Sequence, residues 1–173
     1  GVNKLSDQLD IEVSEAKALV KQYHDRVPFV KGLMNGVQNR LNDKSSAGSI
    51  RSILGRKCRF DLWEPDTFAM NKALPYRDAV KEYGDTTRLK RAYTYKALNR
   101  LIQASAADMT KQAMVNIYRA GKLPMVQIHD EVAMSVKDMD EAREVAHIME
   151  NAVPLEVPNK CDIEMGPSWG EAK

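Results

Sequence analysis

The 173-residue chain has no long apolar run and few of the residues that build metal centres or disulfide frameworks. No stretch reaches the roughly 18 apolar residues that a membrane-spanning helix needs, and the first residues form no signal core. The two cysteines, Cys58 and Cys161, make no Cys-x-x-Cys pair, which argues against structural zinc or a disulfide scaffold. With only three histidines, a His-rich metal centre is also disfavoured. We therefore expect a reduced cytoplasmic protein with no membrane partner.

The composition fits a folded domain rather than a disordered chain. Apolar residues make up 43% of the sequence, which is enough to bury a core. The 26 basic residues nearly balance the 24 acidic ones, for a net charge of +2. Nucleic-acid binding, if present, must therefore come from local clusters of charge and not from the whole chain.

Apolar periodicity predicts a mainly helical chain. Ser14 is the predicted N-cap of the first helix, Pro28 opens the second, and Gly121 ends the longest. The predicted helices cover residues 13–27, 28–43, 76–83, 88–120 and 138–151.

Short apolar stretches with twofold periodicity predict strands between these helices. The predicted strands cover residues 50–54, 58–62, 125–128, 132–136 and 160–165. The first two flank a turn and predict a hairpin, which Trp63-Glu64-Pro65 would end. The segment from 44 to 48 is expected to be a turn. The fold class predicted is α+β, mostly helical with a small antiparallel sheet.

The first candidate site is His129-Asp130-Glu131, between two predicted strands. A tight hairpin there would present Asp130 and Glu131 at its tip. Adjacent carboxylates repel each other, and they are tolerated when solvated or when a hard cation such as Mg²⁺ lies against them. A solvated turn is the alternative explanation.

The second candidate site is one face of the predicted long helix. Tyr95, Asn99 and Gln103 recur at every fourth position and so share a stripe. Carboxamides can contact minor-groove acceptors, and Lys96 and Arg100 beside them could hold phosphates. An ordinary solvated helix face is the alternative.

The third candidate is the basic turn Gly55-Arg56-Lys57, which Arg59 follows. Such a turn could grip a phosphate backbone. It could equally be an exposed basic turn without a ligand.

Taken together and in order, these segments resemble the C-terminal half of family A DNA polymerases, the group of bacterial DNA polymerase I and the T-odd phage replicases. The family shows an Asn-x-x-x-Gln-x-x-x-Ala-Asp helix, here residues 99–108. A strand-turn-strand with His-Asp-Glu follows it, called motif C, here residues 129–131.

The resemblance extends over nearly the whole chain. Residues 1–26 look like the segment after the fingers helix, residues 54–59 like the family's Gly-Arg-Arg/Lys hairpin, and residues 166–169 like its terminal Gly-x-x-Trp. We therefore expect residues 1–173 to be one C-terminal fingers and palm portion, with motif C on a palm sheet. The variant Leu-Asn-x-Leu-Ile-Gln indicates a phage version, which would act in the host cytoplasm.

The resemblance also implies roles for individual residues. Asp130 would bind catalytic metal, Glu131 would lie close to the metals in a secondary role, and His129 would lie near the primer terminus. Asn99 and Gln103 would contact the template–primer minor groove. DNA contacts are also expected of five neighbouring or basic residues: Tyr95, Lys96, Arg100, Arg56 and Lys57. Tyr95 stands where the family often has Arg.

The implied chemistry is two-metal transfer of a nucleotide from a dNTP to the primer 3′-hydroxyl, with Mg²⁺. The family's second metal-binding Asp lies in motif A, an Asp-Tyr-Ser strand, and its triphosphate-binding Lys lies on the motif B helix. Neither segment occurs in this sequence. We therefore expect the chain to be inactive alone and to bind a complementary polymerase fragment with motifs A and B, or to self-associate. A split polymerase gene would produce such a chain, as would a proteolytic or cloned fragment.

Two other classes of protein are alternatives to a polymerase. A metal-dependent phosphohydrolase with a His-Asp pair needs further ligands, whereas His24 and His147 lie on predicted helices. A non-catalytic DNA-binding module, or an inactive remnant, would use the basic residues and leave Asp130 and Glu131 incidental.

Overall fold

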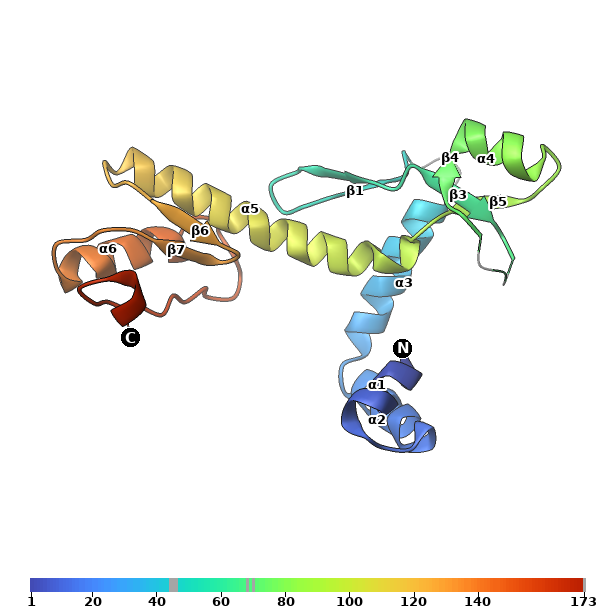
Figure 1. Ribbon diagram of the computed structural model, residues 1–173, viewed down its shortest axis with the longest axis horizontal. Helices are drawn as coiled ribbons and strands as arrows, with labels where there is room; N and C mark the ends of the chain where they lie inside the picture. The colour runs from blue at the N-terminus through green and yellow to red at the C-terminus, as the bar shows by residue number, and fades with distance from the viewer. Residues whose placement is uncertain (44–46, 68, 70, 173) are drawn as a thin grey trace. The chain divides into compact units, whose positions relative to one another are not determined.

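The computed structural model describes residues 1–43, 47–67, 69 and 71–172, and divides into two compact units (Figure 1). The first unit comprises Gly1–Ile50 with Arg59–Asn99. The second comprises Arg51–Cys58 with the chain from Arg100 onward.

Three helices open the first unit: α1 (Val2–Leu9), α2 (Val13–Arg26) and α3 (Pro28–Asn42). Helix α1 packs against α2. Pro28 occupies the first turn of α3, as predicted, because its missing N–H is not needed there. The prediction of Ser14 as a cap was wrong: the extended residue before α2 is Glu12, so Ser14 already lies inside the helix.

The first unit also holds a three-stranded antiparallel sheet. Strand β3 (Leu62–Pro65) lies between β4 (Leu74–Pro75) and β5 (Leu89–Arg91). Helix α4 (Tyr76–Tyr83) packs against β3 and β4, with the bounds that the sequence predicts. Residues 63–65, predicted to follow the end of the first hairpin, lie in strand β3 of a separate sheet, where Trp63 to Pro65 pair in register with Arg91 to Leu89.

The long helix is shorter at its start than predicted. Helix α5 (Ala97–Arg119) begins at Ala97 and not at residue 88. The residues before it form β5, and then the 3₁₀ turn η1 (Thr94–Lys96). Tyr93 between them has the left-handed φ of 61°, which interrupts a right-handed helix. The helical periodicity of this segment was overridden by its pairing with β3.

Two hairpins and one helix flank α5 along the sequence. The first hairpin joins β1 (Ser49–Arg51) to β2 (Lys57–Arg59), and the second joins β6 (Val126–Ile128) to β7 (Glu131–Ala133). All four strands are shorter than predicted. Of the predicted turn at 44–48, residues 44–46 lie outside the described residues.

The second unit ends with α6 (Met139–Glu150) and the 3₁₀ turn η2 (Trp169–Glu171). Asp138 caps α6 by accepting a hydrogen bond from the Glu141 N–H. The strand predicted at 160–165 does not form. The Cys161 N–H donates instead to the carboxylate of Glu150, so it is not available to a neighbouring strand.

Each unit has a small core of its own. In the first unit, the buried apolar side chains include Ala16, Leu41, Phe60, Ala79 and Ala92. In the second, they are Ala113, Ile117, Ala142, Val145 and Val153. The prediction of an α+β fold with small antiparallel sheets is confirmed. Among the described residues, no helix combines the length and apolar character needed to cross a bilayer.

Candidate functional site

The His-Asp-Glu segment lies on the hairpin of β6 and β7. Ile128 pairs with Glu131, so the connecting turn consists of His129 and Asp130 alone. His129 has the left-handed φ of 55°, which lets the chain reverse within two residues. The side-chain amide of Gln127 donates to the His129 carbonyl across the turn. The predicted hairpin is confirmed, with one correction: Glu131 opens the returning strand, and only Asp130 shares the tip with His129.

Solvent reaches the whole turn. His129, Asp130 and Glu131 are all exposed. Mg²⁺ takes oxygen ligands, and it is commonly held by one or two carboxylates while keeping several waters. Asp130 and Glu131 therefore suit Mg²⁺ as a partial ligand set. No group of three His, Cys, Asp or Glu side chains able to hold a metal occurs among the described residues.

Beside this hairpin, the second unit has an open hollow of about 990 Å³. Its lining combines the hairpin with α5, α6 and the C-terminal segment, and includes Asp130 and Glu131. Large apolar side chains line it and still face solvent: Met125 is 63% exposed and Trp169 is 64% exposed. Apolar groups of this size usually lie against more polypeptide.

The basic turn of the first hairpin is bonded to helix α5. The guanidinium Nη2 of Arg56 lies 2.6 Å from Oδ1 of Asp108 and donates to the Ala104 carbonyl at 2.9 Å. The Ile53 N–H donates to the Ser105 hydroxyl at 3.1 Å. Sequence reasoning missed the roles of Asp108 and Ser105. A signal was present for Asp108, which closes the Asn-x-x-x-Gln-x-x-x-Ala-Asp pattern of residues 99–108.

The predicted DNA contacts separate into two groups. Asn99, Arg100 and Gln103 are exposed on α5, as predicted, with Asn99 and Gln103 four residues apart on one stripe. Tyr95 and Lys96 lie on the 3₁₀ turn before the helix, so the prediction that Tyr95 continues this stripe was wrong.

Lys96 already has partners within the fold. Its ammonium lies 5.0 Å from the ring centre of Tyr93 and 5.5 Å from that of Tyr95, within cation–π range. Lys57, at the start of β2, is exposed. By unit, Lys57, Arg100, Gln103 and Asp130 belong to the second, and Tyr95, Lys96 and Asn99 to the first.

The perturbed acids lie on α6 rather than on the predicted site. The Lys137 N–H and then the Lys122 ammonium hold the pKa of Glu141 below its ordinary value. Glu141, followed by Glu144, in turn raises the pKa of Lys122. These ion pairs, at 2.9 and 3.0 Å, join Lys122, three residues beyond the end of α5, to α6. They stabilise the packing of α6 in the second unit and involve none of the predicted site residues.

The other end of α6 is held in the same way. The Cys161 N–H, and then Lys160 at 3.2 Å, lower the pKa of Glu150. Burial, followed by the charge of Glu150, raises the pKa of the Cys161 thiol. A raised pKa lowers the fraction of reactive thiolate at neutral pH.

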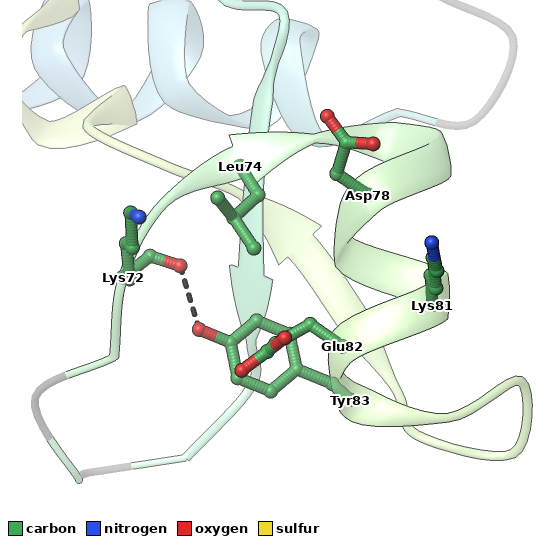
Figure 2. A pocket seen from close by; sticks show the side chains of 6 residues that line it. All are labelled: Lys72, Leu74, Asp78, Lys81, Glu82 and Tyr83. Atoms are coloured by element: carbon green, nitrogen blue, oxygen red, sulfur yellow. Dashed lines mark hydrogen bonds between the residues drawn. The ribbon is translucent and has the colours of Figure 1, made fainter.

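A separate hollow of about 400 Å³ lies beside α4 in the first unit. Figure 2 shows its lining, in which the Tyr83 hydroxyl donates to the Lys72 carbonyl at 2.8 Å. The remaining lining residues carry charges of both signs or are apolar: Leu74, Asp78, Lys81 and Glu82. No residue of the predicted site lies in it.

The order of these elements matches a known family over almost the full sequence. The family model for DNA polymerase family A matches residues 1–171. The chain belongs to DNA polymerase family A. A DNA-directed DNA polymerase of Pseudomonas phage M6 is 40% identical over 158 residues, covering 91% of this chain and 20% of the relative.

Bacterial members of family A are similar as well. DNA polymerase I of Borreliella burgdorferi is 30% identical over 178 residues, covering 97% of this chain and 17% of the relative. A solved structure, the POL domain of Pol1 from M. smegmatis in complex with DNA primer-template and dNTP, superposes with a TM-score of 0.72 at 30% identity. It covers 99% of this chain and 28% of that chain. The chain thus spans about a fifth of the length of the curated relatives it matches.

Proposed function

We propose that this family A chain supplies the motif C part of a template-directed DNA polymerase. Its reaction is the transfer of a nucleotide from a dNTP to a primer 3′-hydroxyl. The observation that carries the proposal is the hairpin of β6 and β7, which presents two adjacent exposed carboxylates beside a two-residue turn. Isolated adjacent carboxylates repel each other, so the arrangement suits a bound hard cation.

In this proposal Asp130 is the metal ligand, with Glu131 near the metal in a secondary role. Bound Mg²⁺ would supply the charge that stabilises the attacking and leaving oxygens. His129, beside Asp130 in the turn, would face the primer terminus. The exposed carboxamides of Asn99 and Gln103 would contact the minor groove of the template–primer duplex.

The cations would position the duplex and read no sequence. Arg100 follows Asn99 on α5, and Lys57 lies on the hairpin whose turn is bonded to α5; both are exposed, so we assign them to phosphates. Tyr95 and Lys96, exposed on the turn before α5, are further proposed DNA contacts.

The remaining catalytic groups must come from polymerase segments that carry motifs A and B. The open hollow beside Asp130, which exposed apolar side chains line in part, favours this arrangement because further polypeptide could cover it. Template–primer DNA, a dNTP and these complementary segments are therefore the proposed partners. Self-association through the same apolar surface is the alternative when those segments are missing.

The test is primer extension on a defined template with Mg²⁺ and four dNTPs. The chain is assayed alone and again with a polypeptide carrying motifs A and B. We expect synthesis only in the mixture. Asp130→Ala should reduce it by about 10³-fold, since several kcal/mol of charge stabilisation are lost. The matched control is Glu156→Ala, an exposed acid in an irregular segment, which should leave the rate unchanged.

Synthesis that survives Asp130→Ala in the mixture would refute the assignment of this residue. A second candidate function, a DNA-binding module without catalysis, is favoured by the exposed basic side chains and the partial ligand set. Duplex binding that is independent of Mg²⁺ and of Asp130, without synthesis in any mixture, would establish that candidate instead.

A further inference from the structure

Arg56, one of the candidate DNA contacts, forms side-chain bonds with two residues of helix α5. Its Nη2 atom serves both Oδ1 of Asp108, at 2.6 Å, and the Ala104 carbonyl, at 2.9 Å. The side chain of Asp108 is only 6% exposed. A buried carboxylate is costly without a cation beside it, so the guanidinium is needed where it lies.

The other carboxylate oxygen of Asp108 strengthens this requirement. Oδ2 is buried and has no hydrogen-bond partner among the described residues. The single guanidinium contact therefore carries most of the compensation for this charge. If Arg56 swung out to follow a phosphate, Asp108 would be left buried and unpaired.

Further bonds hold the same turn, residues 52–56, to the same stretch of helix. The Ile53 N–H donates to the Ser105 hydroxyl, which itself donates to the Leu101 carbonyl at 2.8 Å. Within the turn, the Arg56 N–H donates to the Ser52 hydroxyl at 3.0 Å. The turn thus meets α5 at two points, one through Arg56 and one through Ile53.

These anchors lie between two candidate DNA contacts. Lys57 follows Arg56 directly, and Gln103 precedes Ala104 and Ser105 on the helix. Both side chains are exposed. Fixing the turn on the helix therefore fixes the spacing between a cation on the hairpin and a carboxamide on the helix.

We propose that Arg56 is a positioning residue and not a phosphate ligand: through Asp108 and Ala104 it clamps the hairpin turn onto α5, so that Lys57 and Gln103 meet DNA at a set spacing. This inference rests on the proposed function for its DNA part. The clamp itself rests only on the bonds described above. A guanidinium has five N–H donors, the bonds described above involve only Nη2, and the Arg56 side chain is 47% exposed. A phosphate contact by Arg56 is therefore the alternative that the test must separate from the clamp.

The test measures binding of a primer–template duplex by fluorescence anisotropy across a series of salt concentrations. The chain is used alone and assembled with the polypeptide carrying motifs A and B. The variants are Arg56→Gln, Asp108→Asn, their double mutant and Lys57→Gln. Each phosphate contact contributes about 0.9 to the slope of log K against log salt for B-form DNA. The slope therefore separates a phosphate ligand from a positioning residue.

For a clamp, Arg56→Gln and Asp108→Asn should weaken binding by the same factor, about three- to tenfold, with the slope unchanged. The double mutant should be no weaker than either single variant. Lys57→Gln, the matched control, should lower the slope by about 0.9. Asp108→Asn is the sharpest variant, because removing a negative charge near DNA would tighten binding if charge alone mattered.

A slope that falls by about 0.9 in Arg56→Gln, with unchanged or tighter binding in Asp108→Asn, would overturn the inference. Should Asp108→Asn unfold the second unit, Ser105→Ala replaces it, and the same loss at constant slope is expected. Hydrogen exchange at the Ile53 amide tests the clamp without DNA: exchange must speed up in Arg56→Gln, and unchanged exchange would refute the clamp. A wild-type protein that binds no duplex in either form would refute the proposed function, while faster Ile53 exchange would still support the clamp.

Discussion

The two hairpins that flank helix α5 along the sequence carry charged turns, yet they use these charges in opposite ways. In the turn between β1 and β2, Arg56 forms an ion pair with Asp108, which is buried in the same unit. The turn between β6 and β7 leaves Asp130 and Glu131 exposed, with the hydrogen bond described across it made by Gln127 and the His129 carbonyl. The first turn is stabilised by its charge, whereas the two carboxylates of the second remain exposed to solvent.

This difference separates charges that are paired within the fold from charges that are left exposed, which residue type alone does not do. Both turns look equally suited to bind a ligand in the sequence, one to phosphate and one to metal. The desolvation cost of a buried charge is offset within the fold when an opposite charge lies against it. Two like charges on adjacent residues repel each other, and a bound cation would offset this repulsion.

The largest expected effect is a contrast in stability between the two turns. Arg56→Ala leaves the Asp108 carboxylate buried and unpaired, and should lower the free energy of unfolding by about 2–3 kcal/mol. This figure is at the low end for such pairs because about half of the Arg56 side chain faces solvent. Asp130→Ala, at an exposed position, should change stability by less than about 0.5 kcal/mol. Urea unfolding followed by circular dichroism measures both changes in the free energy of unfolding. Equal losses of stability in the two variants would contradict the expected difference between the turns.

A smaller effect is expected from the second anchor of the first turn. Ser105→Ala removes the acceptor of the Ile53 N–H, and should cost about 1 kcal/mol. Ser135→Ala, just after β7, removes only a weak 3.6 Å contact to the Met125 sulfur and should cost less than about 0.5 kcal/mol. The same unfolding experiment applies. A Ser135 variant as damaging as the Ser105 variant would show that the second hairpin is also anchored by its polar side chains.

The smallest effect concerns acid stability. The Cys161 N–H and Lys160 lower the pKa of Glu150 below its ordinary value of 4.5. Its contribution to stability is therefore complete above pH 4.5 and is lost as the pH falls through the lower folded-state pKa. Glu150→Gln should reduce stability near neutral pH and flatten the decline below pH 4.5, whereas Glu131→Gln on the open hairpin serves as the exposed comparison. Thermal melts from pH 3 to pH 7 would reveal this, and an unchanged acid decline in Glu150→Gln would contradict it.

Local sequence signals predicted several elements of this chain correctly. Helix α4 has the predicted bounds, Pro28 opens α3, and the chain reverses at His129-Asp130-Glu131. Each of these depends on neighbouring residues, through apolar spacing, a fixed proline φ or a turn between two short apolar strands. The membership in family A likewise follows from short motifs in order, and residues 1–171 match the family model.

Predictions failed where a partner distant in sequence decides the conformation. Residues 89–91 have helical periodicity, but they pair with β3 and delay the start of α5, which moves Tyr95 off the predicted stripe. The segment predicted as a last strand gives its Cys161 N–H to Glu150 instead. Periodicity describes one segment at a time and carries no information about such pairings.

The family, the α+β class and the order of the carboxamide and carboxylate motifs can be read from short contiguous segments of the sequence. The partner of each charge depends on how the chain folds. Arg56 and Lys57 are adjacent basic residues in one turn, and nothing in their order distinguishes them. Burial of Asp108 on α5 gives Arg56 a counter-charge, while Lys57 remains exposed to solvent. The energy of a charge depends on its dielectric surroundings and neighbours, and those exist only once the chain has folded.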